Sequence, residues 1–87
     1  MDTRTTPEFW RRFATLPLHI QLLARENFKL FKQNPSHPSL HFKPIKRRGQ
    51  VLYSARIGIH YRALAYENKG TLFWFWIGHH TDYDKII

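Results

Sequence analysis

The most distinctive part of the hydrophobic pattern is a run near the C-terminus that reads LFWFWIGHH, from Leu72 to His80. Its uninterrupted apolar part is far shorter than the roughly 20 residues that a membrane-spanning helix needs. A short, continuous and aromatic apolar run is typical of a strand that is covered on both faces. We therefore expect this run to form the central strand of a sheet. It should end at Gly78 and present His79 and His80 at its C-terminal end.

The N-terminal third of the chain shows apolar residues at helical spacing in two segments. The first begins at Thr6-Pro7-Glu8, where a capping threonine, a proline and an acidic residue mark a helix start, and it continues with Phe9, Phe13 and Leu16. The second ends at Asn34-Pro35, and its apolar stripe consists of Ile20, Leu23, Ala24, Phe28 and Phe31. Because Pro17 separates the segments, the pattern predicts a helical hairpin.

The rest of the chain reads as strands joined by turns. A proline-rich loop from residue 35 leads into a first strand, and Asn68-Lys69-Gly70 is a hairpin turn before the aromatic strand. The residues before Thr6 suit a short edge strand. The strands expected ahead of the aromatic run are Leu40–Ile45, Val51–Ile57 and Ile59–Tyr66.

This order of elements predicts an α+β fold. We expect one domain over residues 1–87, with an N-terminal helix hairpin packed on one face of a small antiparallel sheet. The other face should be free to bind a partner. Trp74 and Trp76 are expected in the core rather than as platforms for stacked bases.

Charge narrows the class of partner. The net charge is +8 and the pI is about 10.3, which favours nucleic acid, an acidic protein or an anionic surface, although a basic domain without such a partner is also compatible. Between Glu26 and Glu67 there is no carboxylate, yet arginines occur there within the predicted strands, at Arg56 and Arg62. The alternative is that these arginines pair with Glu67, Asp82 or Asp84.

Several kinds of site are disfavoured. The chain has no cysteine and no apolar leader, which suits a cytoplasmic protein without disulfides or thiolate metal ligands. His79 and His80 are adjacent, so on an extended chain their side chains point to opposite faces, which is poor geometry for one metal ion. We expect no metal and no cofactor. The remaining chemistry is metal-independent phosphoryl transfer on RNA, where cations, an acid and a base assist attack by the 2′-OH.

In combination, these segments resemble a known family. The helix hairpin, the stretch VLYSARIGIHYRALAY and the stretch FWFWIGHHTDYDKII are similar to the RelE/ParE superfamily of bacterial type II toxin–antitoxin toxins, over nearly the whole chain. The resemblance implies a small cytoplasmic toxin that is neutralised by a cognate antitoxin and has no membrane role. In the RelE branch such a toxin cuts mRNA, usually on the ribosome, as an mRNA interferase. In the ParE branch it inhibits DNA gyrase.

By position, the resemblance also implies a site. Arg56 and Arg62 match cationic positions that would hold the scissile phosphate, and His80 and Tyr83 match residues that would act as base and acid, in an order left open. The product would carry a 2′,3′-cyclic phosphate. Substrate binding is expected from the basic turn and its neighbours: Lys43, Lys46, Arg47, Arg48 and His60.

The sequence departs from this pattern at Ser54, where the RelE-type site has a lysine. The identity of the general base therefore stays open between His80 and His60. Two other functions also remain: a gyrase inhibitor that needs no catalytic groups, and a degenerate basic domain that binds RNA or ribosomes without cutting.

Overall fold

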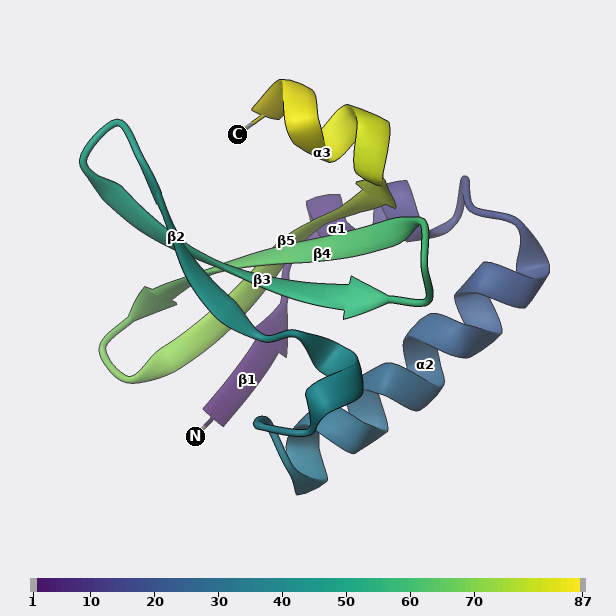
Figure 1. Ribbon diagram of the computed structural model, residues 1–87, viewed down its shortest axis with the longest axis horizontal. Coiled ribbons are helices and arrows are strands. Elements are labelled where there is room, and N and C mark those ends of the chain that lie inside the picture. Colours follow the sequence, from purple (N-terminus) through teal and green to yellow (C-terminus); the bar gives the residue numbers. More distant parts are fainter. Residues whose placement is uncertain (1, 87) are drawn as a thin grey trace.

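The sheet has five strands in the order β1-β5-β4-β3-β2, in a computed structural model that describes residues 2–86 (Figure 1). β1 pairs with β5 in parallel, and the remaining neighbours are antiparallel. In chain order the elements are β1 (Asp2–Thr5), α1 (Pro7–Phe13), α2 (Leu18–Gln33), the 3₁₀ helix η1 (Pro38–Leu40), β2 (Lys43–Arg47), β3 (Gln50–Ile57), β4 (Tyr61–Asn68), β5 (Thr71–His79) and α3 (His80–Ile86). The predicted α+β class, the helix hairpin and the edge strand before Thr6 are confirmed.

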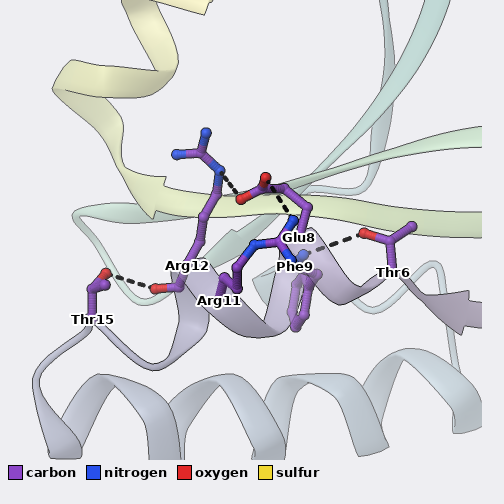
Figure 2. Close-up of polar contacts among 6 residues, drawn as sticks. All are labelled: Thr6, Glu8, Phe9, Arg11, Arg12 and Thr15. Atoms are coloured by element: carbon purple, nitrogen blue, oxygen red, sulfur yellow. Dashed lines mark hydrogen bonds and ion pairs between the residues drawn. The ribbon is translucent and has the colours of Figure 1, made fainter.

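The start of α1 is fixed by the local signals in its sequence (Figure 2). Thr6 Oγ1 accepts a hydrogen bond from the backbone N–H of Phe9 at 3.2 Å, and Pro7 occupies the first helical position. Glu8 in the first turn forms ion pairs with Arg11 at 3.1 Å and Arg12 at 3.4 Å. The start of this short helix is therefore defined by contacts among its own residues.

Helices α1 and α2 cover one face of the sheet. Their apolar stripes bury Phe9, Phe13, Ala24 and Phe31 in a core that they share with Ala55, Ile57, Ala63, Ala65, Leu72, Trp74 and Ile77 of the strands. The edge of the Phe31 ring meets the Trp74 ring, with centroids 5.4 Å apart. The expected burial of Trp74 and Trp76 is confirmed, since they are 3% and 4% exposed.

The aromatic strand was expected at the centre of the sheet, and this prediction is wrong. β5 lies between the short edge strand β1 and β4, and β4 is the central strand. β5 also continues through Gly78 to His79. Its burial alternates over most of its length, so it is not uniformly covered on both faces.

A β-bulge explains how two tryptophans spaced by two residues serve opposite faces. The pairing of β4 with β5 places Leu64 opposite Trp76 but Ala65 opposite Trp74, so Phe75 is an extra residue on β5. Trp74 therefore packs with α2, while Trp76 joins Leu64 on the second face, the side of the sheet away from α1 and α2.

The second face is only partly free, because a C-terminal helix covers part of it. The sequence pattern did not predict the helix α3, which His80–Ile86 form and which contacts β4 and β5 (Figure 1). Tyr83 of α3 lies against Arg62, whose side chain belongs to the second face. Leu52, Ser54, Leu64 and Trp76 are also buried there.

Two strand boundaries differ from the sequence pattern. Leu40 belongs to η1 rather than to a strand, and β2 begins at Lys43. Ile59 and His60 lie in the β3–β4 turn, so β4 begins at Tyr61 and His60 does not share a strand face with Arg62. Gly58 has a φ of +64°, and a Cβ there would lie 2.9 Å from Leu23, so this turn requires glycine. Across residues 2–86 no helix is long and apolar enough to cross a bilayer.

Candidate functional site

Arg56 and Arg62 face each other across the last pairs of β3 and β4. The antiparallel register makes them direct partners, so their side chains project from the same face. Ser54 and Leu64, two residues further along each strand, are also partners on that face. Two like charges placed directly opposite are mutually destabilising, so the sheet holds an unfavourable pair at this position.

No carboxylate relieves that pair within residues 2–86. The ion pairs found there join Arg4 to Asp2, Arg11 and Arg12 to Glu8, and Lys85 to Asp82. The alternative pairing of Arg56 or Arg62 with Glu67, Asp82 or Asp84 is therefore absent from the described structure. The Nε atom of Arg56 is buried and finds no hydrogen-bond partner among these residues. A buried guanidinium N–H without an acceptor is costly, so this position lowers the stability of the fold.

Each arginine is nonetheless held in place. The side-chain amide of Asn27 on α2 donates to the backbone oxygen of Arg56 at 3.0 Å, which fixes the end of β3 on α2. Nη1 of Arg62 donates to Ser54 Oγ at 3.4 Å, and its guanidinium carbon lies 5.2 Å from the centroid of the Tyr83 ring. Ser54, where the RelE-type pattern has lysine, is thus a fully buried acceptor for Arg62.

Helix α3 carries the two predicted proton-transfer residues, of which Tyr83 lies against Arg62. His80 and Tyr83 are three residues apart, so they lie on the same side of α3. His80 is half-buried, and its backbone N–H donates to the carbonyl of His60 at 2.7 Å. The rings of His60 and His80 lie 5.9 Å apart. His60 therefore belongs to this group, although it comes from a turn rather than from a strand.

The expected separation of His79 and His80 is wrong. Their ring centroids are only 4.5 Å apart, because β5 ends at His79 and α3 begins at His80, so the chain is not extended between them. The alternation of side chains holds only while the strand continues. The geometric reason for excluding a shared metal ion therefore does not apply.

The basic turn lies apart from the arginine pair. Arg48 and Gly49 form the tip of the β2–β3 hairpin, both with positive φ, as a two-residue turn of this type requires. Eight residues of nearly extended chain separate Arg48 from Arg56, which is roughly 26 Å along the strand. Lys43 is closer, because it pairs with Ser54 on the second face. The remaining cations of the turn are Lys46 and Arg47.

One group of residues on the second face was missed from the sequence. Tyr66 stacks on Phe73 with ring centroids 5.4 Å apart, and Phe75 lies 5.7 Å from Tyr66. All three are half-buried, so part of each ring is accessible. Alternation along β4 puts Tyr66 on the same face as Arg62. The bulge at Phe75 interrupts the alternation along β5, so the contacts of Phe73 and Phe75 with Tyr66 do not follow from the sequence pattern.

The arrangement suits binding of a phosphate diester. Guanidinium groups stabilise charge that develops on phosphate oxygens, and aromatic rings nearby can stack on bases. The β3–β4 register pairs Arg56 with Arg62, and α3 brings Tyr83 against Arg62 and carries His80 three residues before Tyr83. Lys46, Arg47 and Arg48 flank these residues at a distance.

Comparisons with known proteins identify the family. The family model described as a ParE-like toxin domain matches residues 18–85. No curated protein matches the sequence.

Solved structures of toxins have the same fold. The toxin of the RelBE2 toxin–antitoxin complex from Mycobacterium tuberculosis is 26% identical, with a TM-score of 0.71 over 90% of this chain and 95% of that chain. The archaeal RelE–RelB complex from Pyrococcus horikoshii contains a chain that is 16% identical, with a TM-score of 0.68 over 90% and 92% of the two chains. The YoeB/ParE toxin from Agrobacterium tumefaciens is 15% identical, with a TM-score of 0.67 over 92% and 99%. Since the family model spans most of its length, the chain belongs to the ParE-like toxin family of the RelE/ParE superfamily.

Proposed function

We propose that this toxin is a metal-independent mRNA endoribonuclease that blocks translation, acting as a single domain. The observation that carries the proposal is the Arg56–Arg62 pair, which is opposed across two strands and lacks a carboxylate partner within residues 2–86. An RNA phosphate supplies the negative charge that this pair lacks. The unfavourable placement of two cations becomes favourable when the phosphate binds and gains charge in the transition state.

The proposed reaction uses the nucleophile that RNA carries. The 2′-oxygen forms a bond to the adjacent phosphorus while the bond from phosphorus to the 5′-oxygen of the next nucleotide breaks. One proton leaves the 2′-OH and one proton reaches the departing 5′-oxygen. The products are a 2′,3′-cyclic phosphate and a 5′-hydroxyl end. Arg56 and Arg62 stabilise the phosphorane-like transition state.

His80 and Tyr83 share the two proton transfers. A neutral imidazole offers one nitrogen that accepts a proton, and a phenol offers a proton that it can donate. Both residues lie on the same side of α3, and Tyr83 already contacts Arg62. His60 orients this end of α3 through its carbonyl and lines the substrate path. Ser54 keeps Arg62 in position in place of the lysine of the RelE-type pattern.

The flanking cations bind the rest of the RNA strand. Lys43 lies on the second face opposite Ser54, and Lys46, Arg47 and Arg48 continue along the β2–β3 hairpin. Contacts of this kind follow the backbone of a single strand without reading its sequence. We therefore assign them to affinity for mRNA, including mRNA held on the ribosome.

A cognate antitoxin is the second partner that we propose. Two of the similar structures are RelB–RelE type complexes of a toxin with its antitoxin. A chain with a net charge of +8 favours an acidic partner that folds on binding. Such a partner would be expected to bind less tightly at high salt.

Inhibition of DNA gyrase is the second candidate function, because the matching family model is described as ParE-like. That function depends on a protein–protein contact and has no need of a proton donor and acceptor next to paired arginines. The two candidates therefore differ in whether His80 matters.

The experiment compares wild type and His80→Ala on induction in cells, with immunoblots to match protein levels. Total RNA is mapped for 5′-hydroxyl ends, which can be ligated only after phosphorylation, and plasmid supercoiling is measured in the same cultures. We expect growth arrest with new 5′-hydroxyl ends inside coding regions in wild type, and neither in His80→Ala. Arrest with altered supercoiling and no new ends would replace the proposal with gyrase inhibition. A folded wild-type protein that causes no arrest would indicate a degenerate toxin.

A further inference from the structure

Three histidine rings meet where the β3–β4 turn touches the junction of β5 and α3. His60 comes from the turn, His79 is the last residue of β5 and His80 is the first residue of α3. One ring nitrogen from each can be chosen so that all three nitrogens lie within 4.8 Å of one another. The ring centroids of His60 lie 5.9 Å from those of both His79 and His80. The β3–β4 turn and the β5–α3 junction, which are distant from each other in sequence, thus bring three imidazoles to one place.

The backbone holds this cluster together. The N–H of His80 donates to the carbonyl of His60 at 2.7 Å, which ties the turn to the start of α3. Tyr61 and His79 are direct partners in the β4–β5 ladder, so the neighbours of the histidines are also in register. Gly58, with its positive φ, forms the tight β3–β4 turn that carries His60. The backbone positions of the three histidines are therefore fixed relative to one another by these contacts.

A contact with Thr81 orients the ring of His79. Its Nδ1 accepts from the backbone N–H of Thr81 at 3.2 Å and lies 3.0 Å from Thr81 Oγ1. This leaves Nε2 as the other nitrogen of the ring. Because Nδ1 accepts from the Thr81 N–H, metal binding through Nε2 requires this ring to change tautomer and give up that bond, after which Nδ1–H can donate to the Thr81 hydroxyl.

The donor set indicates the class of ion. Neutral imidazoles suit Zn²⁺, Ni²⁺ and Cu²⁺, whereas Mg²⁺ and Ca²⁺ require oxygen ligands. Around a tetrahedral zinc ion with Zn–N bonds of 2.0–2.1 Å, ligand nitrogens lie about 3.3 Å apart. The nitrogens of the cluster lie within 4.8 Å of one another, so the rings must move closer together to bind one ion. Three histidines leave one coordination position for water.

We propose that His60, His79 and His80 bind one divalent transition-metal ion of the Zn²⁺ class, and that the bound ion switches the toxin off. The second part rests on the proposed ribonuclease function, because it acts through His80. An imidazole whose lone pair binds a metal cannot accept or donate the proton that cleavage requires. The metal site is thus an inhibitory site, distinct from a catalytic metal centre.

Binding is tested first, on the full-length protein without a polyhistidine tag. Calorimetric titration with ZnCl₂ should show one ion per chain for wild type. His79→Asn should weaken binding at least tenfold; asparagine retains an oxygen that can cap α3 by accepting from Thr81, so the fold is preserved. The matched control is His19→Ala. His19 lines a surface pocket together with His60 and His79, but it does not belong to the cluster of three histidines.

Two binding results would overturn the site. One is equal zinc affinity in wild type and His79→Asn, and the other is an equal loss of affinity in His19→Ala. His60→Ala provides a second ligand variant should His79→Asn fail to fold, as judged by circular dichroism. We expect it to lose affinity by the same factor of ten or more.

Inhibition is tested by RNA cleavage with and without zinc. Zinc at a saturating concentration should lower wild-type cleavage at least tenfold, and a chelator should restore it. His79→Asn keeps His80 and should cleave equally well with zinc present. Unchanged cleavage by zinc-loaded wild type would overturn the inhibitory role. If no variant cleaves RNA under any condition, the proposed ribonuclease function fails, and the calorimetric result still decides the metal site.

Discussion

Two pairs of arginines in this molecule have opposite surroundings. Arg11 and Arg12 on α1 share Glu8, at 3.1 and 3.4 Å, and their side chains are 69% and 48% exposed (Figure 2). Arg56 and Arg62 face each other across β3 and β4, are half-buried, and have no carboxylate partner within residues 2–86. Glu8 neutralises one of the two positive charges of the first pair, whereas both positive charges of the second pair remain without a carboxylate within residues 2–86.

The difference teaches which cations in a basic protein carry function. A net charge of +8 makes every arginine a candidate, and the sequence alone does not rank them. Exposed cations with a nearby acid contribute little to stability or to a strong local potential. Opposed, partly buried cations raise the local potential and cost stability, so a fold retains them when a ligand offsets that cost.

The largest expected effect is on cleavage by Arg56→Ala. We expect the rate on mRNA to fall by about 100-fold or more, in the range found when one transition-state donor is removed from an enzyme. Arg12→Ala is the matched control and should stay within about twofold of wild type, because Arg12 is exposed and paired with Glu8. Single-turnover cleavage measures both. Equal losses in the two variants would show that general charge, rather than position, matters.

The next effect concerns RNA affinity. Replacing Lys46, Arg47 and Arg48 together by alanine removes up to three phosphate contacts, and each contributes about 0.7 to the slope of log affinity against log salt. We therefore expect that slope to become shallower by about 2. Filter binding with an uncleavable 2′-deoxy oligonucleotide at several salt concentrations measures it. The cleavage rate of fully bound RNA should change little, because the turn is distant from Arg56. A large drop in that rate would show that the turn is part of the catalytic site.

A smaller effect is a gain in stability. Arg56→Met removes one of two opposed charges and a buried N–H without a partner, so the free energy of unfolding should rise by about 1 kcal/mol. Arg12→Met should change it by less than about 0.5 kcal/mol, because only an exposed ion pair is lost. Urea denaturation followed by circular dichroism compares them. A destabilised Arg56→Met would mean that the arginine has a structural role.

The smallest effect comes from freeing the first pair. Glu8→Gln removes the shared carboxylate and a negative charge near the N-terminus of α1, so stability should fall by about 0.5–1 kcal/mol. Cleavage should be unaffected, although two cations have been released. Enhanced cleavage would show that additional free cations on α1 also hold RNA, which would weaken the contrast between the pairs.

Local signals made much of the fold predictable. Thr6, Pro7 and Glu8 define the start of α1 by contacts within the segment itself, and the hairpin turn that Asn68-Lys69-Gly70 indicates is present, with positive φ at Lys69 and Gly70. The residue pattern of the predicted strands was enough to place Arg56 and Arg62 within β3 and β4. That they are direct partners depends on the register, which tertiary packing sets.

Helix α3 and the histidine cluster were not predictable from local pattern. α3 buries no residue fully, so its sequence lacks a strong apolar stripe, and the helix is positioned by its contacts with β4 and β5. The meeting of His79 with His80 follows from the change of strand to helix between them. The bulge at Phe75 likewise puts Trp74 and Trp76 on opposite faces of the sheet. No proline or glycine lies next to Phe75 to indicate a bulge in the sequence.

The most direct test of the central claim is the map of mRNA 5′-hydroxyl ends in cells that express Arg62→Ala or Arg11→Ala at matched protein levels. The account predicts that Arg11→Ala gives the wild-type pattern of ends and arrests growth, while Arg62→Ala gives neither. Wild-type cleavage by Arg62→Ala, with a folded protein, would contradict the assignment of the opposed arginines to the scissile phosphate.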